Sequence, residues 1–140
     1  MIRVYADMVG DLFHHGHVRF LERASKLGDV LVVGVHSDET VRDYKRPTVM
    51  TMRERLQVIA ACQFVDEVIP DAPLAVSREW IEEHALDLVV HGDDLDEESL
   101  GVRYGVPRDL GIFRLVPYAN GVTTAEIMER VRRRSFTVVR

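Results

Sequence analysis

The sequence predicts an α/β fold, in which a doubly wound (Rossmann-like) parallel sheet of five strands carries helices on both faces. Strand-like and helix-like segments alternate along the chain, as in sheets whose parallel strands are joined by helical crossovers. Residues 30–35, Val-Leu-Val-Val-Gly-Val, form a continuous run rich in β-branched side chains. Such a run is typical of a strand that is buried on both faces, and this pattern predicts a central strand.

The other strands are expected where short apolar runs end at turn residues. With the central run, the five strands are predicted at residues 2–6, 30–35, 64–69, 86–91 and 112–116. Pro70 ends the third of them, since proline donates no hydrogen bond to a sheet. Residues 92–111 contain Asp, Glu, Gly and Arg without clear periodicity, so this stretch is predicted to be a long irregular loop. A loop of that length in a compact domain is usually functional or mobile.

Helices are expected between these strands. In residues 18–27, Phe20, Leu21, Ala24 and Leu27 fall on one helical face, and Gly28 ends the segment. Further helices are predicted after Ser37, from Thr51 to about residue 62, over residues 77–85 and from Thr123 onward. Thr51 and Glu54 have the spacing of a capping box, in which each side chain bonds the other residue's backbone N–H.

Composition restricts the class of protein. The chain has 140 residues, of which 46% are hydrophobic and 29% charged, and this predicts one soluble domain over residues 1–134 with a tail at 135–140. The net charge of −5 argues against a nucleic-acid partner. No apolar stretch approaches the ~20 residues of a membrane span, and no secretory leader is recognisable. We therefore expect a cytoplasmic protein without a membrane partner. The single cysteine, Cys62, excludes an intrachain disulfide.

The segment His14-His15-Gly16-His17 lies where the first strand gives way to a helix. A helix N-terminus attracts phosphate through its free N–H groups and its dipole, and Gly16 would let an anion approach the backbone. His14 and His17 are three residues apart, so both rings can point the same way. Zinc ligation with Asp7 or Asp11, or a surface position without function, are the alternatives.

Five ordered segments carry a resemblance to a known family. They are residues 11–17 (Asp-Leu-Phe-His-His-Gly-His), 34–39 (Gly-Val-His-Ser-Asp-Glu), 65–70 (Val-Asp-Glu-Val-Ile-Pro), 91–94 (His-Gly-Asp-Asp) and 121–124 (Gly-Val-Thr-Thr). In this order and spacing they resemble the small cytidylyltransferases, which include the glycerol-3-phosphate and ethanolamine-phosphate enzymes. The resemblance covers about residues 2–130. It implies transfer of CMP from CTP to a small phosphate-bearing acceptor by in-line attack, without a covalent intermediate.

The resemblance also implies roles for individual residues. The catalytic set is expected to be His14, His17, Lys45 and Arg55. The nucleotide-binding set is expected to be Met8, Val9, Gly10, Asp11, Gly16, Asp94, Tyr118, Gly121, Thr123 and Thr124. Asp11 is also the candidate ligand for Mg²⁺, the metal that suits phosphate oxygens. A homodimer is expected from the resemblance alone.

The chain departs from the family pattern at two places. Residues 7–10 (Asp-Met-Val-Gly) have the glycine in a different position, and residues 118–119 (Tyr-Ala) replace an arginine-threonine pair. A tyrosine carries no charge, so it does not substitute for a phosphate-binding arginine. Either the domain binds nucleotide without catalysis, or Arg103, Arg108 or Arg114 supplies the missing charge. We favour the second interpretation.

The acceptor remains open at this point. Arg103, Tyr104 and Arg108 form the candidate acceptor site, which suits a compact anion such as a phosphonocarboxylate of an antibiotic pathway. Ethanolamine phosphate would instead need a carboxylate for its ammonium, with Asp96, Glu97 and Glu98 as candidates. Glycerol 3-phosphate is a third possibility. Two rival functions also stay open, an adenylyltransferase of the same superfamily and a non-catalytic nucleotide-binding module.

Overall fold

The predicted five-stranded sheet is present in the computed structural model, which describes residues 1–118 and 122–134. All strand pairs are parallel, and the order across the sheet is β3-β2-β1-β4-β5. The strands are β1 (Arg3–Met8), β2 (Val30–Val35), β3 (Glu67–Ile69), β4 (Leu88–Gly92) and β5 (Phe113–Val116). Chain order reverses between β1 and β4, so the switch point that such sheets use for ligands lies at the end of β1.

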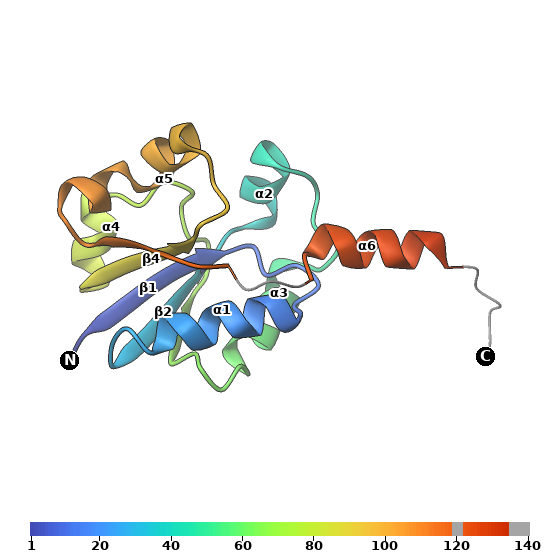
Figure 1. Ribbon diagram of the computed structural model, residues 1–140, viewed down its shortest axis with the longest axis horizontal. Helices are drawn as coiled ribbons and strands as arrows, with labels where there is room; N and C mark the ends of the chain where they lie inside the picture. The colour runs from blue at the N-terminus through green and yellow to red at the C-terminus, as the bar shows by residue number, and fades with distance from the viewer. Residues whose placement is uncertain (119–121, 135–140) are drawn as a thin grey trace.

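The helices follow the strands as the alternation predicts (Figure 1). They are α1 (His15–Ser25), α2 (Asp38–Tyr44), α3 (Met52–Ala60), α4 (Arg78–Glu83), α5 (Glu97–Asp109) and α6 (Thr124–Arg133). The N-caps expected from the sequence are confirmed: Ser37, Thr51, Ser77 and Thr123 each accept a backbone N–H of the first turn. Thr51 and Glu54 form the predicted capping box.

The side-chain alternation of β1 separates two apolar cores. Val4, Ala6 and Met8 belong to the core that α1 and α3 cover. Tyr5 faces the other core, to which α4 and α5 contribute. Successive side chains of a strand point to opposite faces, so Asp7 continues the face of Tyr5, toward α5. This parity places a carboxylate at the end of the central strand and on the α5 side of the sheet.

Two sequence predictions are corrected here. The third strand was expected over residues 64–69, but β3 covers only Glu67–Ile69, because the chain still turns at Val65, whose N–H donates to the carbonyl of Cys62. The predicted irregular loop at 92–111 is in large part the helix α5. Its Gly101, Gly105 and Pro107 conceal the helical pattern, and Tyr104 has non-helical φ/ψ of −125° and 16°. Packing of Leu100 and Tyr104 into the core stabilises this kinked helix.

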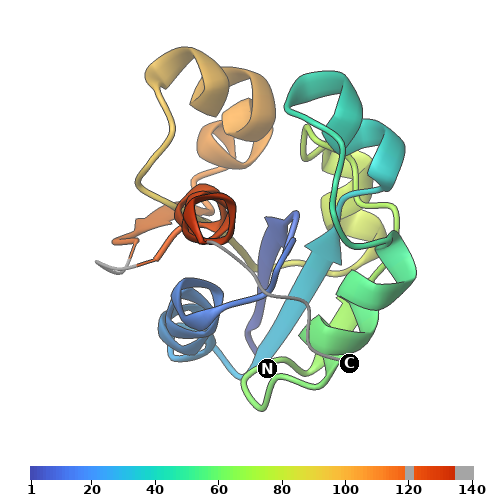
Figure 2. The same ribbon diagram turned by 90° about the vertical axis from the view of Figure 1, so that its right-hand side faces the viewer.

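Helix α6 leaves the sheet at the carboxyl ends of the strands. It extends beyond the α/β body in Figure 1, and Figure 2 views the molecule from this end, with α6 seen along its axis between α1 and α5. None of its residues is buried. Over the described ranges 1–118 and 122–134, no helix has the length and apolar character needed to cross a membrane.

Candidate functional site

A cavity with a volume of about 550 Å³ opens at the carboxyl ends of β1 and β4. Its position is the switch point of the sheet, and its volume is in the range of small-molecule sites. Its wall comes from the ends of β1 and β4 with the residues that follow them, from α1, from the start of α6, from the end of α2 and from single residues of α5 and the loops after β2 and β5: Asp7, Met8, Val9, Gly10, Asp11, His17, Phe20, His36, Tyr44, Lys45, Arg46, His91, Gly92, Asp94, Leu95, Arg103, Tyr118, Thr123, Thr124 and Ala125.

The two histidines are fixed by hydrogen bonds at the start of α1. His14 is the N-cap, and its Nδ1 accepts the N–H of Gly16 at 3.0 Å. Nδ1 of His17 accepts the backbone N–H of His14 at 3.1 Å. A backbone N–H can only donate, so both neutral rings must carry their proton on Nε2. The ring centroids are 3.9 Å apart, which confirms that the spacing brings the two rings together.

Of the two histidines at the start of α1, His17 lines the cavity and His14 does not. Burial, with the nearby His14 and Lys45, lowers the pKa of His17 to about 3. At neutral pH it is therefore an uncharged donor, with Nε2–H as its one donating group. Burial, together with the charge of Arg46, also lowers the pKa of the Lys45 ammonium that shares the cavity wall. A neutral donor and a cation beside a positive helix end suit a polyphosphate.

His14 connects α1 to α6. Its Nε2 lies 3.2 Å from Oγ1 of Thr124, and that hydroxyl donates to the carbonyl of Asp11 at 3.1 Å. Gly16 allows this approach, because a Cβ there would meet the carbonyl oxygen of Val122 at 2.6 Å. The sequence suggested that Gly16 admits an anion to the backbone. In the structure, Gly16 is buried and its missing side chain admits the segment that precedes α6.

Asp7 lies at the cavity floor inside a polar cluster. The hydroxyl of Tyr104 donates to its Oδ1, while His36 Nε2 and Arg103 Nη2 lie 3.5 and 3.7 Å from its Oδ2. Burial alone would raise the pKa of Asp7, but His91, His36 and Arg103 outweigh it and hold the pKa below its usual range. Asp7 is therefore a buried carboxylate that stays ionised.

Asp11, the predicted magnesium ligand, has a different environment. Its carboxylate accepts the backbone N–H groups of Val49 and Met50, both at 2.9 Å, and a guanidinium N–H of Arg46 at 3.2 Å. These bonds outweigh the effect of burial and lower its pKa. Both oxygens are used to hold the loop before α3. In the described part of the chain, no group of three His, Cys, Asp or Glu side chains is placed to share a metal ion.

Arg55, predicted to be catalytic, lies beneath the cavity rather than in its wall. It is fully buried. Its guanidinium donates to the carbonyls of Val9 and His36 at 2.7 and 2.9 Å and to the Asp38 carboxylate at 2.6 Å. It also donates to the Met50 carbonyl at 3.2 Å. Arg55 thus holds the loops that follow β1 and β2, a placement that favours a positioning role over the predicted catalytic one.

The predicted nucleotide-binding residues mostly meet at this cavity. Met8, Val9 and Gly10 follow β1 into the wall, and Gly10 needs its flexibility because its φ is +69°. Asp94, Tyr118, Thr123 and Thr124 reach the same cavity from β4, β5 and α6. Gly121 lies outside the described residues.

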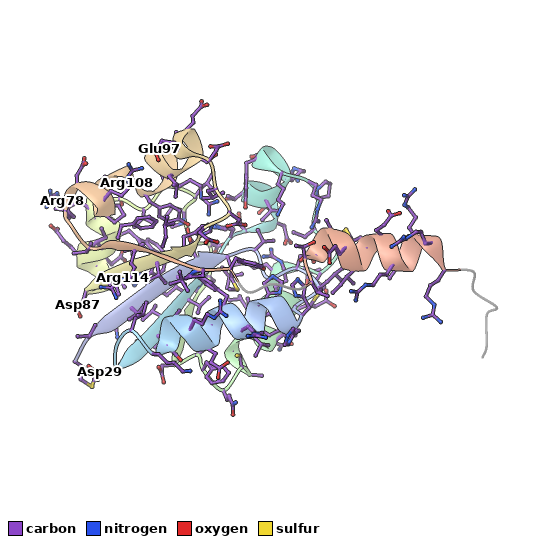
Figure 3. All side chains as sticks on the ribbon, viewed as in Figure 1. Asp29, Arg78, Asp87, Glu97, Arg108 and Arg114 are labelled. Atoms are coloured by element: carbon purple, nitrogen blue, oxygen red, sulfur yellow. The ribbon has the colours of Figure 1, made fainter. Side chains whose placement is uncertain are left out.

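The three candidate arginines separate clearly. Arg103 lines the cavity and is 8% exposed, and its neighbour Tyr104 supports the cavity floor. Arg108 pairs with Glu97 at 2.7 Å on the surface, and Arg114 is exposed on β5. Figure 3 shows both away from α6, on the left of the view. Arg108, predicted as an acceptor ligand, does not line the cavity and is paired with Glu97 instead.

The sequence did not single out several residues of the cavity wall, among them His36, Tyr44, Arg46 and His91. His36 directly follows β2 and His91 lies in β4, so both stand at the edge where parallel strands end. Their position after or at the end of a predicted strand was the feature of the sequence that could have identified them. Tyr44 and Arg46 had no such feature, because only the path of the chain after α2 brings them to the cavity.

Comparison with known proteins gives consistent matches. The family described as Cytidylyltransferase-like matches residues 10–130. An ethanolamine-phosphate cytidylyltransferase of Dictyostelium discoideum is 40% identical over 133 residues, covering 91% of this chain and 37% of its own length. Choline-phosphate cytidylyltransferase A of Mus musculus is 40% identical over 136 residues, covering 94% of this chain and 37% of its own length. The chain thus spans about a third of these relatives.

One solved structure matches over nearly its full length. It is a lipopolysaccharide core biosynthesis protein from Thermoplasma volcanium, with a TM-score of 0.68 and 32% identity over 85% of this chain and 99% of that chain. Pantothenate synthetase from Thermus thermophilus, with a TM-score of 0.53 and 19% identity, shows the fold alone. The family match over residues 10–130 includes most of the residues that line the cavity.

Proposed function

Since the chain belongs to the cytidylyltransferase-like family, we propose that it transfers CMP from CTP to a small acceptor that bears a phosphate or phosphonate. The observation that carries this proposal is His17 at the start of α1, whose neutral ring is oriented by the His14 backbone and lies in the wall of the cavity that Lys45 also lines. The family relation and the phosphate-suited helix end point to the same cavity.

In the proposed reaction, an oxygen of the acceptor attacks the α-phosphorus of CTP. The bond from the α-phosphorus to the oxygen bridging the α- and β-phosphates breaks, and pyrophosphate leaves with the electron pair. His17 would donate its Nε2–H to the charge that develops on the phosphate oxygens, and Lys45 would neutralise the pyrophosphate. His14 already uses Nε2 toward Thr124, so its share is to orient His17 and to hold α6 against α1.

Magnesium is expected to enter with the triphosphate. Mg²⁺ commonly binds through substrate phosphates and one or two carboxylates. The described residues do not form a protein-held site for it, since Asp11 is occupied by the loop before α3. Asp94 has a 58% exposed side chain at the cavity and is the carboxylate there that a phosphate-bound ion could reach. No step of the proposed reaction is assigned to the metal.

The test is incubation of the protein with each of the four nucleoside triphosphates, Mg²⁺ and a panel of small phosphates and phosphonates. Products are read by mass for the nucleotide adduct, and pyrophosphate is measured in parallel. CTP-dependent adduct formation is expected. Preference for ATP would favour an adenylyltransferase, and CTP binding without turnover on any acceptor would favour a non-catalytic module. Size-exclusion chromatography with light scattering tests the proposed homodimer.

A further inference from the structure

We propose that Arg103 selects an acceptor whose far end, remote from the phosphate or phosphonate, carries a carboxylate rather than an ammonium group. The inference rests on the proposed CMP transfer and assigns the acceptor class to the same cavity. Its structural basis is the place of one guanidinium beside Asp7. The acceptors named for the curated relatives, ethanolamine phosphate and choline phosphate, both carry a positively charged nitrogen.

The guanidinium of Arg103 is buried and has donors to spare. Nη2 donates to the Tyr104 hydroxyl at 3.1 Å and lies 3.7 Å from Oδ2 of Asp7. Nε is buried without a hydrogen-bond partner among the described residues. Since Nε has almost no exposed surface, a ligand meets the guanidinium at its Nη1 and Nη2 edge. A carboxylate fits, because it can accept two parallel N–H bonds from one guanidinium.

Asp7 accepts the Tyr104 hydroxyl at Oδ1, while Oδ2 has no hydrogen-bond partner among the described residues; the positive charge of Arg103, 3.7 Å from Oδ2, opposes an ammonium group there. The Tyr104 hydroxyl lies 2.8 Å from His91 Nδ1, and because it donates to Asp7, the His91 ring must donate to it. The carboxylate at the cavity floor therefore already has its cation within the protein.

The other carboxylates do not replace it. Asp11 is held by Arg46 and two backbone N–H groups. Asp96 caps α5 and Glu97 pairs with Arg108, and neither they nor Glu98 line the cavity. Asp94 remains, but at 58% side-chain exposure its charge is well solvated and binds an ammonium group weakly.

Two aromatic rings beside Arg103 already face its guanidinium. The Cζ atom of Arg103 lies 5.9 Å from the ring centroid of Tyr44 and 5.2 Å from that of Tyr104. Both distances are within the range of cation–π contacts. An ammonium entering here would meet rings that already face a positive charge. Arg103 thus already occupies the position between Asp7 and the Tyr44 ring that an ammonium group would otherwise take.

A matched series of acceptors tests the inference. 2-Aminoethylphosphonate, 2-hydroxyethylphosphonate and phosphonoacetate share a phosphonate and two carbons, and they differ in the charge of the far end. With the unmodified protein and CTP, we expect kcat/KM for phosphonoacetate to exceed that for 2-aminoethylphosphonate by at least about tenfold, as charge-assisted bonds to arginine predict. A preference for the amine would overturn the inference.

Two variants test the residue itself. Arg103→Met keeps an unbranched apolar stem and removes the guanidinium, so the preference should fall at least about tenfold or invert. Arg103→Lys keeps the charge and should retain the preference with a smaller loss. A ratio unchanged within about threefold in Arg103→Met would contradict the role of Arg103. Urea unfolding of each variant shows whether it is folded, and the series on the unmodified protein decides the acceptor class without any variant.

A failure of the proposed reaction is distinguishable from a failure of this inference. If none of the acceptors receives CMP, binding of the three phosphonates is measured by titration calorimetry with the same proteins. Tighter binding of phosphonoacetate that depends on Arg103 would uphold the inference while the reaction is rejected. Equal binding of the three phosphonates, or tighter binding of 2-aminoethylphosphonate, would reject the inference about Arg103.

Discussion

The backbone N–H of His14 donates to Nδ1 of His17 at 3.1 Å, and this bond places the proton of the neutral His17 ring on Nε2. A backbone donor thereby fixes which nitrogen can donate to a ligand. The capping arrangement at the start of α1 and the chemistry assigned to His17 are consequently one feature of the structure.

The first prediction concerns this donor. His17→Ala should lower kcat for CMP transfer by about 10²–10³-fold, the loss typical when one donor to a developing negative charge is removed. His17→Gln places an amide N–H near the position of Nε2 and should recover part of the rate. Steady-state pyrophosphate release measures both. Activity of His17→Ala within about threefold of the unmodified protein would remove His17 from the mechanism.

The second prediction concerns pH and stability. The pKa of His17 is about 3 in the folded protein, below the ~6.5 of an unfolded histidine. Below pH ~6.5 the unfolded chain therefore takes up a proton that the folded chain does not, and stability falls as pH decreases toward about 3. The limiting slope is about 1.4 kcal/mol per pH unit for one group. Burial lowers the pKa of His14 and of His36 too, so both residues add to the loss of stability at low pH.

Urea unfolding at several pH values between 7 and 4.5 checks this dependence. His17→Gln removes the titrating group and should give a shallower decline than the unmodified protein. An equal slope in both proteins would show that His17 is not held neutral by the fold.

The third prediction concerns Arg55. Arg55→Met should lower the free energy of unfolding by about 3–5 kcal/mol, because it leaves buried carbonyls without a donor and Asp38 without its cation. Asp38→Asn is the matched control: the amide oxygen can still accept from the buried Arg55 guanidinium but supplies no negative charge, so we expect a smaller loss of about 1–2 kcal/mol. Both are measured by urea unfolding. If Arg55→Met kept full stability and lost only CTP binding, Arg55 would be a ligand residue instead.

The fourth prediction concerns the contact between α1 and α6. Thr124→Val removes the hydroxyl that lies between His14 Nε2 and the Asp11 carbonyl. We expect a loss of about 1 kcal/mol in stability, as for one hydrogen bond, together with reduced kcat. Thr124→Ser keeps the hydroxyl and serves as control. A double-mutant cycle with His14→Ala should show a coupling of about 0.5 kcal/mol or more, and strict additivity would contradict the contact.

The sequence by itself determined the elements whose signals are local. Residues 30–35 had to form a buried strand, because six consecutive residues without a charge leave no polar face. Thr51 with Glu54 marked a helix start, since the capping box needs only residues within one turn. The same holds for His14 and His17, whose spacing already brings the rings together at a helix end.

Only the tertiary structure decided the chemistry at the cavity floor. The helix α5 was not recognisable, because its glycines and Pro107 weaken the local preference and packing against the sheet stabilises it. Arg103 and Arg108 were equivalent candidates in the sequence, but the fold turns one toward Asp7 and the other toward Glu97. Asp7 and Arg103 are 96 residues apart in the numbering, and nothing local relates them. A charge pair of that separation exists only once β1 and α5 have packed.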